Sequence, residues 1–321
     1  MKDFLKKIKK DDITFLLALG VFVIVGIFRY YDENMLYHIA PWPILQSVGF
    51  NKFAMMVLVG SMFLFYLISI IKVNKENKKM IYYLSAFLSV FLVPLFSTVE
   101  YFGTMDMYAW MILFWIVISF TFDKLAWISV PLSFLMLFIS PMSVFNCGVL
   151  VLVLSLFKKN SLLICNIIAE IVAVVFSISM YGLNTDAQHV LSIAKFFAMS
   201  IMHVPYLIIA FIFFGGIIKK ATGNKKIVWT CFVLGALPSI LVNFYIGDYA
   251  RTILYTFMYF ILGVMYFIVR GDSLAVSLMS ETKEKVKEWV PIPAVLVAYP
   301  LLFVTFWIAG PVVLFTEVFT G

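Results

Sequence analysis

The sequence places an acid and a base three residues apart, Asp248 and Arg251, at the end of a long apolar segment. Residues with this spacing share one face of a helix, so the two side chains can act together. Asp248 can cap the N-terminus of the helix that follows it. The guanidinium of Arg251 matches the geometry of a phosphate group. The pair is therefore either a helix cap beside a lipid headgroup or one wall of a site for a phosphate-bearing ligand.

Further polar residues fall on the same predicted side of the membrane as this pair. They are Asp32, Glu33, Glu100, Asp106, Asp186, His38 and His189. Many tyrosines and tryptophans lie close to them in the sequence. Carboxylates accept hydrogen bonds from hydroxyl groups and aromatic rings cover C–H faces, so this combination suits a sugar or another polyhydroxyl ligand. The alternative is that these acids are solvated loop residues and that the aromatic residues belong to the membrane interface.

The composition predicts an all-α, polytopic integral membrane protein. The chain has 321 residues, of which 64% are apolar and only 13% are charged, whereas ordinary globular domains carry about 25% charged residues. Such a chain crosses a bilayer as apolar helices. The net charge of +7 is explained by cytoplasmic lysines facing anionic lipid. We therefore expect membrane lipids as partners and no nucleic acid.

Apolar segments predict about eleven transmembrane helices in a single domain over residues 1–321, with the N-terminus in the cytoplasm. A basic arm at 1–12 precedes them, and a cytoplasmic surface helix is expected at 271–289. The spans are expected at about residues 13–28, 54–72, 80–97, 107–122, 125–157 (two), 161–181, 190–218, 227–246, 252–270 and 290–309. We expect the first span to be retained rather than removed as a signal peptide.

Two of these segments are irregular. The apolar run from Leu125 to Phe157 is longer than the about 20 residues that one helix needs to cross a bilayer, and it contains Pro131 and Pro141. It predicts two short spans with a turn at 140–148, or a half-buried hairpin that other helices shield. The segment at 227–246 is interrupted by Gly235 and Pro238.

Basic residues support this topology. Only Arg29, Lys52, Lys195 and Arg251 fall on the outer side of the predicted arrangement, and the other lysines and arginines fall inside. An error of one span would reverse this asymmetry along the rest of the chain. We expect the chain to be an integral protein of the bacterial plasma membrane.

Three polar residues fall within predicted spans, namely Asn166, Glu170 and His203. A buried ionised carboxylate is costly, so Glu170 should be neutral, paired or facing a cavity. A structural hydrogen bond and a proton-coupling site remain equally open. Cys147, Cys165 and Cys231 have no metal-binding spacing and should be small buried side chains.

The arrangement of acids resembles the GT-C superfamily of polytopic glycosyltransferases. Members of that superfamily have acids directly after the first span and again between the third and fourth spans. Asp32 and Glu33 match the first position, and Glu100 or Asp106 matches the second. The segment Gly247-Asp248-Tyr249-Ala250-Arg251 is also similar to a motif in bacterial surface-polysaccharide membrane proteins.

This resemblance implies a glycosyltransferase or polysaccharide-assembly protein of the cell envelope. It would use a polyprenyl-phosphate-linked sugar at the outer face. Asp32 is the first candidate for the general base and Glu33 the second, and Asp106 completes the catalytic set. A divalent metal bridging Asp32 and Asp106 remains an open alternative to a metal-free reaction. The candidate substrate-binding residues are Arg251, Asp248, Glu100, His38, Lys195 and Arg29.

Two other functions remain open for this sequence. A transporter or a flippase for lipid-linked glycans would use Glu170, Asn166 and His203 as a polar site near the bilayer midplane. A membrane scaffold without catalytic activity would need none of these residues.

Overall fold

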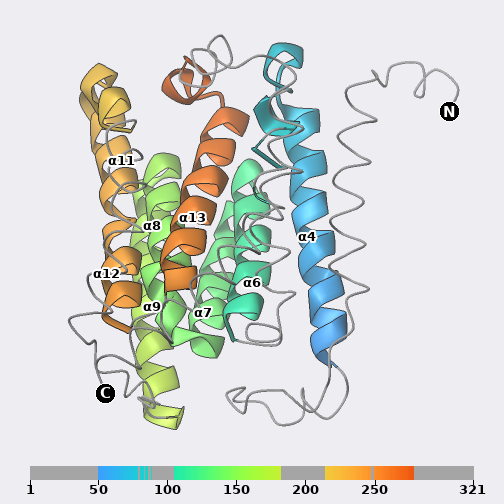
Figure 1. The fold of residues 1–321 in the computed structure, drawn as a ribbon, viewed down its shortest axis with the longest axis vertical. Coiled ribbons are helices and arrows are strands. Elements are labelled where there is room, and N and C mark those ends of the chain that lie inside the picture. Colours follow the sequence, from blue (N-terminus) through green and yellow to red (C-terminus); the bar gives the residue numbers. More distant parts are fainter. Residues whose placement is uncertain are drawn as a thin grey trace, which may run out of the picture.

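The computed structural model describes residues 50–78, 80–82, 84–85, 88, 105–181, 214–246 and 249–277. In these ranges every regular element is a helix (Figure 1). The α-helices are α4 (Phe50–Lys72), α6 (Met105–Thr121), α7 (Ser129–Ile139), α8 (Cys147–Lys158), α9 (Asn160–Tyr181), α11 (Gly223–Leu234), α12 (Leu237–Ile246) and α13 (Tyr249–Val269). Short 3₁₀ turns are η2 (Lys75–Asn77), η3 (Ala126–Ile128) and η4 (Pro141–Phe145). The predicted all-α class is confirmed for the described residues.

Two helices in the described ranges are long and apolar enough to cross a membrane, at Asn160–Met180 and Gly223–Val242. The first is α9, which falls on the segment predicted at 161–181. Helices α4, α6 and α13 likewise fall on segments predicted from the sequence. The predicted spans at 13–28 and 290–309, and most of those at 80–97 and 190–218, lie outside the described residues, as does most of the helix expected at 271–289.

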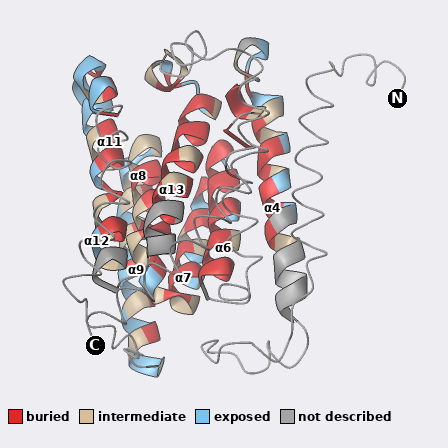
Figure 2. Ribbon diagram, viewed as in Figure 1, coloured by how far each residue is buried: buried red, intermediate tan, exposed pale blue. Residues whose placement is uncertain are grey.

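Helix α6 forms the centre of the bundle. It packs against α4, α7 and α8, and Figure 2 shows it buried along nearly its whole length. Apart from Asp106 in the first turn, its sequence is largely apolar on every side, as expected for a helix that other helices surround. Helix α9 differs, because one of its faces is both apolar and exposed, with Ile168, Ile171 and Val175 each more than half exposed. An apolar face of this kind suits contact with lipid.

Helices α7 and α8 form a short hairpin whose tip is η4. With 11 and 12 residues, they extend only about 17 and 18 Å, which is less than the about 30 Å of a bilayer core. Pro141 begins η4, because a proline is tolerated at the first position of a helix and Ser140 before it has left the helical conformation. The turn predicted at 140–148 is found at η4, between two short helices. Two full spans and a half-buried hairpin both stay predictions for this segment.

The predicted interruption at Gly235 and Pro238 separates α11 from α12. The amide of Ala236 bonds to the carbonyl of Val233, so the helical bond to the carbonyl of Phe232 is lost. The hydroxyl of Tyr259 in α13 donates to that carbonyl at 2.9 Å. A side chain of α13 therefore provides the hydrogen bond that the carbonyl of Phe232 loses where α11 ends.

Candidate functional site

Asp106 is the centre of a buried polar cluster. It lies in the first turn of α6, and the residue is only 9% exposed. Its Oδ1 accepts hydrogen bonds from Ser140 Oγ at 3.3 Å and Ser143 Oγ at 3.1 Å. Its Oδ2 accepts one from the hydroxyl of Tyr255 at 2.8 Å. We call these four residues the Asp106 cluster. Asp106 was expected on the outer side near a span end, and it lies at a helix end but inside the bundle.

The local sequence explains how the two serines reach Asp106. Ser140 follows the last residue of α7 with a backbone that is no longer helical, and Pro141 then starts η4. Ser143 follows one short turn later, so its Oγ lies 2.7 Å from that of Ser140. The two hydroxyls thus form a pair at the tip of the hairpin. An acid in the first turn of α6 is also favoured by the helix dipole.

Tyr255 connects the cluster to α13. Its ring lies against Trp110 of α6, with the ring centroids 5.8 Å apart. Arg251 is in the same helix, four residues before Tyr255, so its backbone lies one turn closer to the start of α13 and on the same face. The side chain of Arg251 lies outside the described residues. Helix α13 thus carries the predicted phosphate-binding position one turn from the Asp106 cluster.

Glu170 is a second buried acid, and its surroundings differ. It is 3% exposed, and neither carboxyl oxygen has a hydrogen-bond partner among the residues that the structure describes. It faces the start of α8, because a Cβ added to Gly148 would lie 3.0 Å from Glu170 Oε2 and 3.3 Å from Val144. Val144 lies beside the same Cβ position, and the residue before it, Ser143, donates a hydrogen bond to Asp106. The two acids therefore lie in the same region of the bundle.

Asn166 has a structural role. Its amide donates to Ser129 Oγ at 3.1 Å and to Ser155 Oγ at 2.9 Å, which joins α9 to α7 and α8. It is fully buried. Its Oδ1 is buried and has no hydrogen-bond partner among the described residues, and no hydrogen bond joins Asn166 to Glu170 there.

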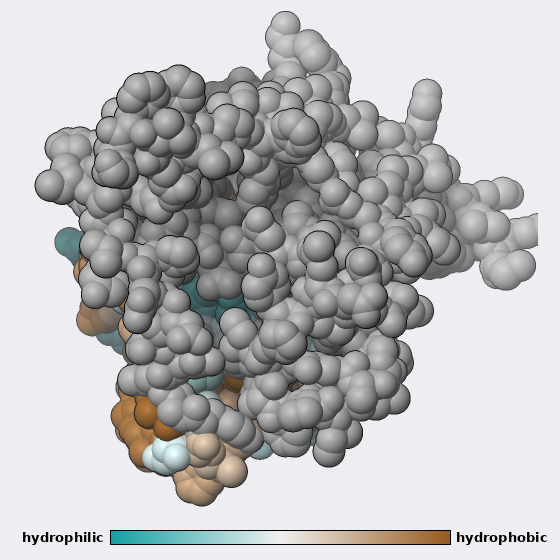
Figure 3. All heavy atoms as spheres, turned by 60° about the horizontal axis from the view of Figure 1, so that its bottom comes forward, coloured by the Kyte–Doolittle hydropathy of each residue, from teal (hydrophilic) through white to brown (hydrophobic). Residues whose placement is uncertain are grey.

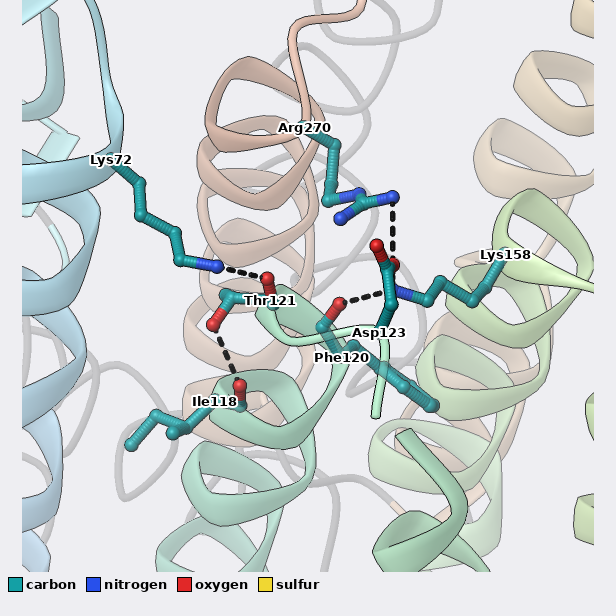
Figure 4. A network of polar contacts seen from close by, with 7 residues as sticks. All are labelled: Lys72, Ile118, Phe120, Thr121, Asp123, Lys158 and Arg270. Carbon is teal, nitrogen blue, oxygen red and sulfur yellow. Dashed lines mark hydrogen bonds and ion pairs between the residues drawn. The ribbon is translucent and has the colours of Figure 1, made fainter. Parts of the chain in front are cut away.

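The basic residues Lys72, Lys158 and Arg270 lie at the opposite end of the bundle, which we call the lysine end (Figure 4). Lys158 donates to the carbonyl of Phe120 at 2.9 Å and also binds Asp123. Lys72 donates to the carbonyl of Thr121. Both lysines therefore satisfy carbonyl groups that α6 leaves open at its C-terminus, where positive charge is favoured.

Figure 3 looks toward the other end, which contains the Asp106 cluster, and hydrophilic atoms are visible in the middle of that face.

Asp123 is shared by two cations at the lysine end. Besides Lys158, the guanidinium of Arg270 lies 3.3 Å from its carboxylate. The hydrogen bond from Lys158, and then the charge of Arg270, lower the pKa of Asp123. The ends of α6, α8 and α13 are thus tied together through one exposed carboxylate.

Most of the residues predicted for the site lie outside the described residues. These are Arg29, Asp32, Glu33, His38, Glu100, Lys195 and Asp248, together with Asp186, His189 and His203. The described ranges contain no group of three His, Cys, Asp or Glu side chains that could hold a metal ion. A metal between Asp32 and Asp106 therefore stays a prediction.

The three hydroxyl groups of the Asp106 cluster were not predicted from the sequence. The signal for two of them is the segment Ser140-Pro141-Met142-Ser143, which places two hydroxyls and a helix-breaking proline within an apolar run. Tyr255 had no signal of its own, because a tyrosine in an apolar helix is common. No protein-family model, no curated protein and no solved structure matches this chain.

Proposed function

We propose that the chain is a polytopic protein of about eleven spans in a bacterial plasma membrane, with the lysine end in the cytoplasm. We further propose that it transfers or assembles sugars from a polyprenyl-phosphate donor at the outer face. The Asp106 cluster lies at the end of the bundle that this topology places outward. The apolar, exposed face of α9 supports the membrane setting.

The observation that carries this proposal is the hydrogen bond from Tyr255 to Asp106. It joins the start of α6, which carries one of the predicted catalytic acids, to α13, which carries Arg251 one turn away. These positions are far apart in the sequence, and both were assigned to one site on chemical grounds. Their proximity supports a site that combines a carboxylate with a phosphate-binding arginine.

Each residue has a distinct role in the proposed reaction. Asp32, or Glu33 beside it, removes the proton from the acceptor hydroxyl as that oxygen forms the new glycosidic bond. Arg251 binds the departing polyprenyl phosphate, whose negative charge grows as the old glycosidic bond breaks. Asp106 accepts hydrogen bonds from the sugar, and the hydroxyls of Ser140, Ser143 and Tyr255 fix the orientation of its carboxyl group. Asp248, Glu100, His38, Lys195 and Arg29 line the remainder of the proposed site.

Donor binding tests the role of Arg251. The full chain is reconstituted in liposomes and titrated with a radiolabelled polyprenyl-phosphate sugar. Arg251→Lys keeps the charge but loses the bidentate geometry, so donor binding should weaken at least about tenfold, equivalent to a lost charge-assisted hydrogen bond. Arg270→Lys, the same exchange at the lysine end, should bind like the wild type. Equal binding by all three proteins contradicts the proposal.

The base has a separate test. Asp32→Asn should bind donor normally and lose turnover by about 10²–10⁴-fold, because only proton removal is affected. Turnover at the wild-type rate would remove Asp32 from the mechanism. Glu33→Gln in the same assay distinguishes the two candidate bases.

A transporter or flippase is the second candidate function, and two observations favour it. Glu170 is buried without a partner among the described residues, and helices interrupted near the middle, like α11 and α12, are typical of transporter sites. Glu170→Gln should then abolish movement of a labelled lipid-linked sugar across the liposome membrane. A transferase without transport activity would show no movement in wild type or variant.

A further inference from the structure

The carboxyl group of Glu170 lies in a position that the proposed transferase does not use. Helix α9 carries it into the interior, where it meets the first turn of α8 near Gly148. Both oxygens are buried and lack hydrogen-bond partners among the described residues. Asp106, the other buried acid of this region, has three hydroxyl partners. The contrast indicates that Glu170 is not a structural hydrogen-bonding group.

No described cation neutralises Glu170. Helix α9 packs against α7, η4 and α8. Neither α7 nor η4 contains a titratable residue, and α8 contains only Cys147 and, at the lysine end, Lys158. Lys158 is bound to Phe120 and Asp123. Cys165 is the other titratable residue of α9 whose side chain is described. Asp106, the other buried acid of this region, supplies no positive charge.

Two features of this position act in opposite directions. An ionised carboxylate without hydrogen bonds or a counter-charge is costly in an apolar interior, which favours a bound proton. The N-terminus of α8 carries partial positive charge, which favours the ionised form. The same partial charge disfavours a metal cation, and the described residues hold no group of three metal-binding side chains. A proton is therefore the ligand that this position fits.

We propose that Glu170 and the N-terminus of α8 form a reversible proton-binding site inside the bundle. A proton from water forms an O–H bond with one carboxyl oxygen, and the bond breaks when the proton returns to water, so that nothing is oxidised or reduced. The N-terminus of α8 stabilises the carboxylate after release. This site adds to the proposed transferase and does not depend on it.

Infrared difference spectroscopy of the full chain in lipid vesicles tests the site without an activity assay. Lowering the pH should produce the C=O stretching band of a protonated carboxylic acid, and isotope-labelled glutamate should shift that band. Glu170→Gln, which has nearly the same size, should lack the band. Asp106→Asn should keep it. A pH titration in which no band depends on Glu170 overturns the proposal.

Two further measurements test the role of α8 and distinguish a proton from a metal cation. In Gly148→Ala the added methyl group lies between the carboxyl group and α8, so the ionised form loses stabilisation and the midpoint of the band should move to higher pH. An unchanged midpoint contradicts the role of α8. Replacing potassium by sodium at constant pH should leave the band intact, and its disappearance would show a metal-cation site instead. If Glu170→Gln does not fold, the labelled wild type and Gly148→Ala still decide the question.

Discussion

The hydroxyl of Tyr255 lies 2.8 Å from Oδ2 of Asp106, and this hydrogen bond joins α13 to the start of α6. The hairpin tip reaches the same carboxyl group from another side through Ser140 and Ser143. Three separate segments of the chain therefore position one acid. Because hydrogen bonds from these segments fix its carboxyl group, Asp106 is the best-defined member of the proposed site.

Tyr255→Phe removes this hydrogen bond and leaves the ring against Trp110. We expect a loss of about 1–3 kcal/mol in the free energy of unfolding, because Asp106 loses a partner in a buried position. Turnover should also fall, since the carboxyl group is less well oriented. Tyr259→Phe is the matched control, because its hydroxyl bonds to a backbone carbonyl one turn further along α13. The control should lose stability and keep turnover, and equal turnover in both variants would separate Tyr255 from the site.

Gly235→Ala should be strongly destabilising. The added Cβ would lie 2.5 Å from the hydroxyl of Tyr259 and 2.8 Å from Val149 Cγ1. Overpacking of this kind costs about 1–3 kcal/mol. Gly60→Ala is the control, because the new Cβ meets nothing within 4 Å in α4 and should stabilise the helix by about 0.5–1 kcal/mol. Thermal unfolding in one detergent compares the two, and a stable Gly235→Ala protein would contradict the packing between α11 and α13.

Asp123 should make stability depend on pH in the acidic range. Its pKa is lowered in the folded protein, chiefly by the hydrogen bond from Lys158. Its contribution is therefore present above the ordinary pKa of an unfolded aspartate, about 3.9, and is lost as the pH falls through the lower folded value. The difference in unfolding temperature between wild type and Asp123→Asn should shrink below about pH 4. Because Asp123 is exposed, added salt should also reduce this difference. A difference that stays constant with pH and salt would contradict the ion pairs.

The lysine end should face the cytoplasm. Single cysteines at Lys159 and Lys226, both exposed, are placed in a protein whose own cysteines are replaced. A reagent that cannot cross membranes should label them only after the cells are opened, because lysine-rich loops stay inside. Labelling in intact cells would reverse the topology and place the Asp106 cluster on the cytoplasmic side.

Much of the described fold was predictable from the sequence because it depends on local patterns. The apolar segments at 161–181 and 252–270 form helices α9 and α13 with almost the expected bounds. The proline at 141 and the Gly235–Pro238 pair located both interruptions, since each residue acts on the backbone beside it. Helix bounds and interruptions depend on nearby residues, so they can be predicted from a single sequence.

The site was less predictable because it depends on contacts between distant segments. Asp106 was identified as a candidate from its type and its position at a span end. Its partner Tyr255 follows almost half the chain later, and no local pattern indicates that the two meet. The hydroxyl partners of the Asn166 amide nitrogen and the lack of described partners at Glu170 were equally hidden, since only packing decides which buried polar atom finds a partner.

Turnover of a polyprenyl-phosphate sugar by Asp106→Asn tests the proposed site most directly. The variant keeps the size of the side chain and removes its charge, and Asp123→Asn makes the same exchange at the lysine end. Both proteins are reconstituted in liposomes, checked for folding and given the labelled donor and acceptor lipid. We predict that Asp123→Asn turns over donor like the wild type and that Asp106→Asn loses at least about tenfold, the effect of about 1.4 kcal/mol at the transition state. Wild-type turnover by a folded Asp106→Asn protein would contradict the site.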